Sequence, residues 1–361
     1  MKWLKPVAVV CAVVLTLSAL VPGSGGTSFA ASGHASSLSI ALSNSYAGNS
    51  WRQQMIKTYA VAGKTAASQG LIAKWTIVNA DNSATQQISQ IQNMILQHWS
   101  AITIDAASPT ALNGVIARAC AAGIKVVVFD SLATAPCAYK VAYNYVSMGL
   151  TEANYVAQRL HGKGNVLEIR GIAGTSVDND IHAGIVKGFA KYPGIKLVGS
   201  VHGNWTETIA QQAVQGILPS LPKIDAVVDQ GGDGYGCARA FAAANRPTPL
   251  IIEGNREDEL RWWSQQAKER GYDTISISST PGVAAIAFWV AYQVLQGATV
   301  PKVVQVPLLE ITKKDLNVWM NATPATGVAT PQYSLAWTKK LIDANLHHKP
   351  LPPVPFPGQS S

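Results

Sequence analysis

A repeated strand–turn–helix pattern in the second half of the chain constrains the fold most strongly. Glycine or polar residues stand where a predicted strand gives way to a helix in segments 171–189 (GIAGTSVDNDIHAGIVKGF), 204–206 (NWT) and 224–234 (IDAVVDQGGDG). The carboxyl ends of parallel strands share one edge of an open α/β sheet, and ligands bind at that edge. Together with the amino-terminal segment discussed below, the pattern favours an exported ligand-capturing protein over an enzyme.

Strands and helices alternate along nearly the whole chain, an order typical of parallel sheets built from βαβ units. The predicted strands are 38–43, 75–80, 101–105, 125–130, 165–170, 195–200, 224–229, 249–254, 274–279 and 302–306. The predicted helices are 50–69, 84–98, 109–122, 148–161, 181–192, 207–218, 233–244, 257–269, 282–297 and 334–345, and 308–320 is predicted as a short strand and a capped helix. The strands form two series divided after residue 130, which predicts two copies of one α/β architecture.

The amino terminus has the features of a secretion signal. Lys2 and Lys5 precede an apolar run over 7–21, and small residues follow up to Ala30. This order is typical of a signal peptide, predicted here over 1–30 with cleavage near Ala30. The alternatives are a membrane anchor, for which the run is shorter than the ~20 residues that span a bilayer, and a lipid anchor at Cys11, which lies inside the apolar run. We therefore expect an exported protein, periplasmic or extracellular.

Composition excludes several classes of protein. Charged residues make up 13% of the chain and hydrophobic residues 48%, which indicates a well-packed globule and not a disordered chain. The net charge is +8, but the basic residues are scattered and form no tract. Nucleic-acid binding would need a basic face or a recognised module. We interpret the charge as a solvated surface and expect no nucleic-acid partner.

Three cysteines follow the predicted leader. Cys120 ends a predicted helix and Cys137 lies in the loop after the next strand, and both a disulfide and two free thiols are open for this pair. Cys237, within a predicted helix, is expected to be a buried free thiol. No Cys/His spacing matches a zinc site, and we expect no metal and no cofactor.

Several segments together resemble the periplasmic sugar-binding proteins of ABC transporters, in the ribose-binding type. The resemblance covers about 38–320 and depends on the order and spacing of the segments. They are SNSYAGNSW, DNSATQQISQIQNMI, AAGIKVVVFDS, GIAGTSVDN, KGFAKYPGIKLVGS, NW, IDAVV and TISISSTPGVAAIAFWVAYQVLQG. The same fold serves sugar-responsive repressors, but those carry an amino-terminal helix-turn-helix where this chain has its predicted leader.

The resemblance implies two Rossmann-like lobes, each a parallel sheet flanked by helices, joined by three hinge crossovers. The expected boundaries are 38–142 with 279–305 for the first lobe, 143–278 with 306–320 for the second, and crossovers near 142–144, 278–279 and 305–307. Residues 321–361 would form a carboxyl-terminal extension whose Pro-rich tail is expected to be extended and poorly ordered. A monomer would capture a sugar or polyol between the lobes by hinge closure and deliver it to an ABC permease.

Candidate binding residues follow from the strand ends and the resemblance. A polyol needs hydrogen-bonding groups around its hydroxyls and an aromatic surface against its C–H face. The candidates of the first lobe are Asn44, Tyr46, Asn49, Trp51, Asp105, Asp130 and Ser131. Those of the second lobe and the hinge are Ile172, Asp178, Asp180, Trp205, Gly232, Asp233, Asn255 and Ser278.

The resemblance also implies roles for four of these candidates. Asp130 matches the aspartate that accepts hydroxyl hydrogen bonds, and Trp205 matches the aromatic residue that stacks on the sugar. Trp51 lies near the aromatic residues of the family's first lobe. Asn255 stands where the family often has an aspartate.

The sequence departs from the family pattern at three places. Ser131 stands where an arginine often follows the aspartate, and 176–183 lacks the arginine that grips the sugar. Gly231 and Gly232 replace an asparagine common after the eighth strand. We therefore expect an acidic and aromatic pocket without guanidinium groups. Such a pocket favours a neutral sugar or polyol, or an amine, over carboxylates and phosphates.

Other interpretations stay open at the level of sequence. Asp178, Asp180 and Asp233 can instead cap the helices that follow them, and Trp51 can serve packing in a first helical turn. Trp262 and Trp263 are expected to pack and not to bind ligand.

Two rival functions also stay open. A sensory protein would use the same ligand capture to report to a membrane receptor or kinase. A hydrolytic enzyme using the cleft aspartates is more remote, because the chain has no nucleophile elbow, phosphate loop or HExxH motif. We therefore do not expect catalysis.

Overall fold

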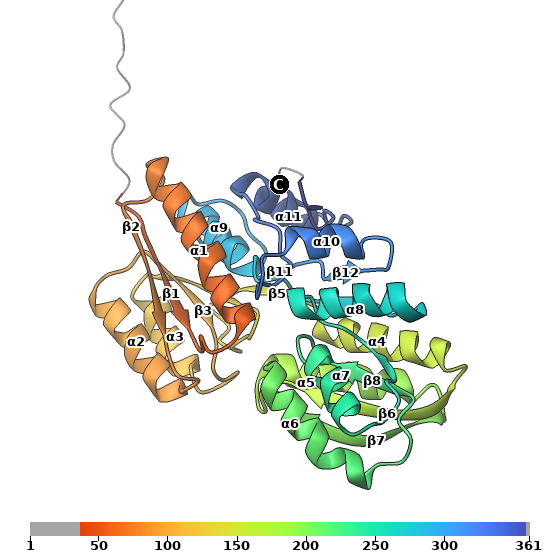
Figure 1. Cartoon of the computed structure of the whole chain (residues 1–361). Helices are drawn as coiled ribbons and strands as arrows, with labels where there is room; N and C mark the ends of the chain where they lie inside the picture. Colours follow the sequence, from red (N-terminus) through yellow and green to blue (C-terminus); the bar gives the residue numbers. More distant parts are fainter. Residues whose placement is uncertain (1–36, 359–361) are drawn as a thin grey trace, which may run out of the picture. The chain divides into compact units, whose positions relative to one another are not determined.

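The structure, a computed structural model, describes residues 37–358 (Figure 1). The predicted signal peptide lies outside the described residues. In the part that the structure describes, no helix is long and apolar enough to cross a membrane. Within the same range, no group of three or more His, Cys, Asp or Glu residues could hold a metal ion.

Six parallel strands form the first sheet, in the order β11-β5-β4-β3-β1-β2. The strands are β1 (Ser39–Asn44), β2 (Lys74–Asn79), β3 (Ala101–Asp105), β4 (Lys125–Phe129), β5 (Tyr139–Ala142) and β11 (Val303–Gln305). The helices are α1 (Ser50–Ser68), α2 (Ala84–Leu96), α3 (Asn113–Ala121) and α9 (Val283–Leu295). Successive side chains of a strand point to opposite faces, so Ile40 and Leu42 share a core with α1 and α9, whereas Ala41 shares one with α2 and α3. We call this sheet and its helices the first lobe.

Four parallel strands form the second sheet, in the order β7-β6-β8-β9. The strands are β6 (Lys163–Arg170), β7 (Gly194–His202), β8 (Ala226–Asp229) and β9 (Leu250–Ile251). The helices are α4 (Tyr145–Arg159), α5 (Ser176–Phe189), α6 (Glu207–Ile217), α7 (Gly234–Ala243) and α8 (Glu257–Arg270). Gly149 and Gly184 let α4 and α5 approach closely, because a Cβ on either would overlap a backbone carbonyl of the other helix. We call this sheet and its helices the second lobe.

Three connections join the lobes. They run from β5 to α4, from β10 (Ser276–Ser278) to α9, and from β11 to β12 (Leu309–Ile311). β10 and β12 pair antiparallel with each other. The predicted α/β class is confirmed by this architecture. β5 was not predicted, and β9 is shorter than the predicted strand 249–254.

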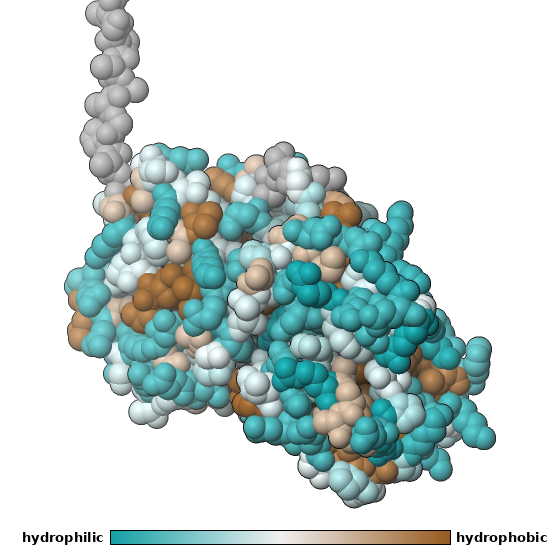
Figure 2. Space-filling view, viewed as in Figure 1, coloured by the Kyte–Doolittle hydropathy of each residue, from teal (hydrophilic) through white to brown (hydrophobic). Residues whose placement is uncertain are grey.

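α8 separates a charged outer side from an apolar inner side. Figure 2 shows hydrophilic side chains covering its outer side, where Arg261, Lys268 and Arg270 are exposed. On the inner side Trp263 is fully buried, and the ring of Trp262 meets that of Tyr272 at 5.3 Å. Both tryptophans therefore serve packing, as expected.

The carboxyl-terminal extension packs on both lobes. α10 (Leu316–Ala322) packs on α8, and α11 (Leu335–Leu346) packs on α9 and β11. The Pro-rich tail has no helix or strand in its described part, up to residue 358. The Phe356 ring meets that of Trp319 at 5.7 Å, and Trp337 Nε1 donates to the carbonyl of Pro353. The prediction of a poorly ordered tail is therefore wrong for 353–356, because apolar residues tie it to α10 and α11.

A disulfide joins Cys120 of α3 to Cys137 of the loop that leads into β5. It pins the 131–138 loop, which begins directly after Asp130, to α3 of the first lobe. Cys237 is a free, fully buried thiol in α7, as predicted. Burial raises the pKa of the Cys237 thiol well above its usual value, so this thiol stays protonated and inert.

Candidate ligand site

A pocket lies where strand ends of both lobes meet the crossovers. It holds about 500 Å³ of empty space, open solvent at its mouth included. Its walls come from the start of α1, the end of β4, α4, α5, the turn after β8 and the segment before α8. The lining residues are Asn49, Trp51, Arg52, Asp130, Tyr145, Met148, Val177, Trp205, Gln230, Gly231, Gly232, Asn255, Arg256, Ser278 and Ser279.

Asp130 is the buried carboxylate of this pocket. It follows β4 with a positive φ of 55°, a backbone conformation that turns the chain sharply at the strand end. The Tyr145 hydroxyl donates a hydrogen bond to Asp130 Oδ1, and Arg52 Nη2 lies 3.6 Å from Oδ2. Burial raises the pKa of Asp130, while Arg52 and the Tyr145 hydrogen bond act in the opposite direction. Two side chains therefore hold this carboxyl group in one orientation.

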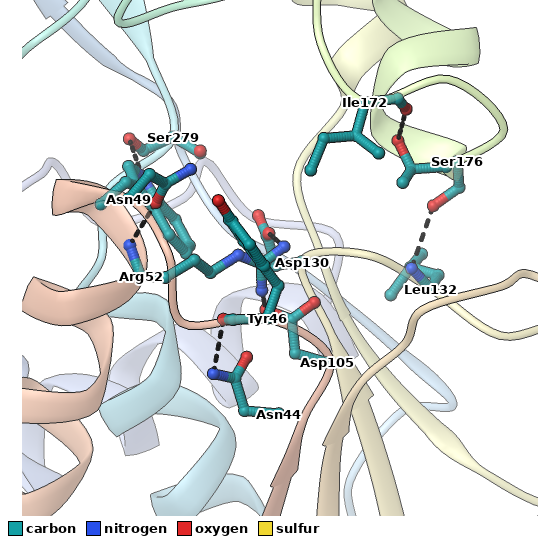
Figure 3. Close-up of polar contacts among 12 residues, drawn as sticks. Asn44, Tyr46, Asn49, Arg52, Asp105, Asp130, Leu132, Ile172, Ser176 and Ser279 are labelled. Atoms are coloured by element: carbon teal, nitrogen blue, oxygen red, sulfur yellow. Dashed lines mark hydrogen bonds and ion pairs between the residues drawn. The ribbon is translucent and has the colours of Figure 1, made fainter. Parts of the chain in front are cut away.

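Arg52 stands between two carboxylates in the first turn of α1. Its guanidinium group forms ion pairs with Asp105 and Asp130 (Figure 3). Asn49 begins the helix, since its Oδ1 accepts a hydrogen bond from the backbone N–H of Arg52 at 2.8 Å. Burial lowers the pKa of Arg52, and Asp130 offsets part of that effect. The arginine is thus held by the protein itself.

Arg256 links the two lobes across the pocket. Its Nε donates to Ser50 Oγ of the first lobe at 2.7 Å, and Nη2 donates to the carbonyl of Trp205 at 2.7 Å. Nη1 donates to the carbonyl of Gly232, whose φ of 93° suits glycine. The prediction of a pocket without guanidinium groups is therefore wrong, because Arg52 and Arg256 both line it.

Two tryptophans and two aliphatic side chains give the pocket its apolar surface. Trp51 Nε1 donates to the carbonyl of Ser279 at 3.4 Å, which anchors the ring to a crossover. Trp205 has a positive φ of 52°, and its ring lies over Gly171, where a Cβ would overlap it. Met148 and Val177 complete this surface. The pocket therefore combines a fixed carboxylate with aromatic faces, the two features that a polyol needs.

The structure brings together several of the residues predicted from the sequence. Those that line the pocket are Asn49, Trp51, Asp130, Trp205, Gly232, Asn255 and Ser278. Their contact with a ligand stays a prediction. The candidates that do not line it are Asn44, Tyr46, Asp105, Ser131, Ile172, Asp178, Asp180 and Asp233.

The first-lobe candidates outside the pocket contact other residues of the protein. The Asn44 amide donates to the carbonyl of Tyr46 at 2.7 Å (Figure 3). It also donates to Asn79 Oδ1 at 2.8 Å. Tyr46 lies over Gly48, and Asp105 pairs with Arg52. The carbonyl of Ser131 accepts the backbone N–H of Ala106. These groups shape the loops that hold Asn49 and Asp130.

The second-lobe candidates outside the pocket are likewise bound within the protein, buried behind the pocket or turned to solvent. The Asp178 carboxylate forms two hydrogen bonds with Arg170, at 3.0 and 2.7 Å. Asp180 points to solvent from α5, and Asp233 is fully buried at the start of α7. The carbonyl of Ile172 accepts a hydrogen bond from Thr175, the residue that caps α5. None of these three aspartates caps a helix with its side chain.

Sequence reasoning missed several of the lining residues. Arg52 and Arg256 directly follow Trp51 and Asn255, whereas the family pattern predicts arginines after the fourth strand and in 176–183. Tyr145 follows a crossover, where the chain reverses between lobes. The signal for the two arginines was their place at the start of a helix, directly after a predicted site residue.

Comparisons with known proteins agree with this geometry. The chain is 32% identical to the xylitol-binding protein of Mycolicibacterium smegmatis, over 50% of this chain and 53% of that protein. It is 28% identical to a D-apiose import binding protein of Paraburkholderia graminis, over 50% and 59%. The chain thus spans a little over half the length of these relatives. A solved structure of an ABC transporter solute binding protein from Thermobispora bispora has a TM-score of 0.84 and 37% identity, covering 89% of this chain and all of that chain.

The fold is that of a two-lobed α/β protein with a pocket lined by residues of both lobes. The family model described as a periplasmic binding protein domain matches residues 40–299. The chain belongs to this family, which is a family of solute-binding proteins and not of enzymes.

Proposed function

We propose that this protein is exported, captures a neutral sugar or polyol between its lobes as a monomer, and delivers it to an ABC permease. The observation that carries the proposal is the buried Asp130 carboxylate, oriented by Arg52 and Tyr145 in a pocket that also holds two tryptophans. A carboxylate fixed in this way accepts hydrogen bonds from hydroxyl groups and discriminates strongly against ligands that lack them.

The two arginines do not favour an anionic ligand. Arg52 forms ion pairs with Asp105 and Asp130. Each guanidinium nitrogen of Arg256 already donates one hydrogen bond within the protein, to Ser50 or to one of two backbone carbonyls. A bidentate grip on a carboxylate or phosphate needs a free guanidinium edge. The names of two relatives, which refer to xylitol and D-apiose, support the same class of ligand.

Lobe closure is the mechanism in this proposal. Asn49, Trp51 and Asp130 belong to the first lobe, and Trp205 and Asn255 to the second. A ligand that contacts both groups stabilises the closed arrangement, and only this difference in affinity shifts the population of the two states. No catalytic step is part of the proposal.

A thermal-shift panel tests the class of ligand. We expect stabilisation of the mature protein by one pentitol, pentose or related polyol, since a ligand at 100 times its Kd adds about 2.7 kcal/mol to the free energy of unfolding. Amino acids, dicarboxylates and sugar phosphates serve as the comparison set. A shift with an anion alone would contradict a neutral ligand. Co-purification with a sensor kinase in place of a permease would favour the sensory role.

Replacement of Trp205 by alanine should weaken binding of the ligand found in the panel by about 2 kcal/mol, on the order of a buried aromatic anchor. The reason is the loss of the ring that covers Gly171 in the pocket. Isothermal titration calorimetry measures the change. Trp262→Ala is the matched control, because Trp262 packs on Tyr272 away from the pocket. Equal affinity of the two variants would remove Trp205 from the site.

A further inference from the structure

Residues 327–333, between α10 and α11, cross from one lobe to the other. We call them the strap. At one end the backbone N–H of Glu257 donates to the carbonyl of Gly327 at 3.1 Å, and Val328 forms an antiparallel bridge with Arg256. These contacts attach the strap to the second lobe.

The other end of the strap attaches to the first lobe. The backbone N–H of Gly282 donates to Thr330 Oγ1 at 2.8 Å, just before α9 begins. Within α9, Trp289 Nε1 donates to the carbonyl of Tyr333 at 3.2 Å. Tyr333 is fully buried, and its ring lies 4.4 Å from that of Trp337 in α11. The strap is therefore anchored in the apolar core of the first lobe, beside the three connections of the chain.

The strap also holds a pocket residue directly. Ala329 donates its backbone N–H to the carbonyl of Asn255 at 2.8 Å, and Asn255 Nδ2 donates to the carbonyl of Ala329 at 3.1 Å. The same Nδ2 donates to the carbonyl of Ser279 at 3.1 Å. An amide nitrogen has two hydrogens, so both are engaged. Oδ1 is then the atom of this side chain left for a ligand, as an acceptor of a hydroxyl hydrogen.

We propose that the strap is a positioning element for ligand binding: it orients the Asn255 amide so that Oδ1 faces the ligand, and it ties the adjacent Arg256 to the first lobe. The proposal deepens the proposed function, on which it rests. The ligand affinity of this chain thus depends on a segment that lines no part of the pocket.

Two substitutions loosen the strap without touching the pocket. Thr330→Val keeps the side-chain shape but removes the acceptor of the Gly282 N–H. Ala329→Pro removes the N–H that binds the carbonyl of Asn255. Thr338→Val is the matched control, because it makes the same chemical change in the extension, where the buried Thr338 hydroxyl donates to the carbonyl of Ser334, the residue that caps α11.

Calorimetric titration with xylitol, D-ribose, D-arabinose and myo-inositol measures the effect on affinity. We expect Thr330→Val and Ala329→Pro each to raise the Kd for the probe that binds by about three- to tenfold, the range for one net hydrogen bond. Thr338→Val should leave this Kd unchanged, even where it lowers the melting temperature as much. An unchanged Kd in both strap variants would overturn the proposal.

Hydrogen exchange gives a second measurement that needs no ligand. The backbone amides of Glu257 and Gly282 donate to the strap, so their exchange should speed up in both strap variants and not in Thr338→Val. If the wild type binds none of the four probes, the proposed class of ligand is wrong. The exchange rates then test on their own whether the strap holds the two lobes in place. Unchanged exchange at both amides would then overturn it.

Discussion

Replacement of Asp130 by alanine should weaken ligand binding at least about 30-fold, which corresponds to about 2 kcal/mol. Asp130 is the carboxylate that lines the pocket, and its exposed fraction is only 5%. A ligand hydroxyl that loses this acceptor inside a closed cleft is left without a partner, and its desolvation is then uncompensated. The substitution also leaves Arg52 with one carboxylate in place of two.

Titration calorimetry of the purified variants measures this loss. Asp180→Ala is the matched control, because Asp180 was predicted for the same site but points to solvent from α5. Asp130→Asn separates charge from shape, since it can still accept the Tyr145 hydrogen bond. We expect Asp130→Asn to lie between the wild type and Asp130→Ala. Equal affinities for Asp130→Ala and Asp180→Ala would remove Asp130 from the binding site.

The fold was predictable from the sequence because strand and helix periodicities are local signals. The two series of strands, the long buried helix α9 and the polar strand ends all appear in the order of the residues. β5 escaped prediction because YKVA is short and follows a loop that carries Cys137. Its place in the sheet depends on pairing with β4, which lies across a loop, and with β11, which lies far away along the chain.

The site was predictable only in part, because a strand end gives the place of a residue but not its partners. Asp105 ends β3 and Asp130 follows β4, both in the first sheet. Arg52 reaches both, and this pairing keeps Asp105 away from the pocket. Asp178 likewise stands at a predicted ligand position, but Arg170, eight residues earlier, takes up its carboxylate. Such pairings come from side-chain geometry in the folded chain and not from spacing.

A second group of carboxyls lies behind the glycine turn that forms one wall of the pocket. Asp229 and Glu259 accept backbone N–H groups around that turn, Asp229 from Gly231 and Glu259 from Gly234. Asp233 and Glu253 are fully buried beside them. Burial raises the pKa of all four, to about 8 for Asp233 and about 8 for Glu259. Arg256 offsets part of this rise for Asp229, Asp233 and Glu259. Several of these groups are therefore neutral acids in the folded protein at neutral pH.

The free energy of unfolding should consequently fall as the pH rises from about 5 to about 8. In this window the unfolded chain has released these protons, because an ordinary carboxyl has a pKa near 4, while the folded protein still binds them. Each proton retained only by the folded state lowers stability by about 1.4 kcal/mol per pH unit. The loss should become less steep above about pH 8, where the folded protein also releases the protons of Asp233 and Glu259.

Urea unfolding at a series of pH values tests this dependence. Glu253→Gln should flatten the slope, because both Glu253 side-chain oxygens lack a hydrogen-bond partner and its pKa lies well above the usual value. Glu310→Gln is the control, since it makes the same chemical change at an exposed position of β12. A stability that stays constant between pH 5 and 8 would mean that these carboxyls are ionised when buried. If Glu253→Gln leaves the pH dependence of the unfolding free energy unchanged, the retained protons belong to groups other than Glu253. With the expected slope, the glycine wall of the pocket is backed by neutral acids.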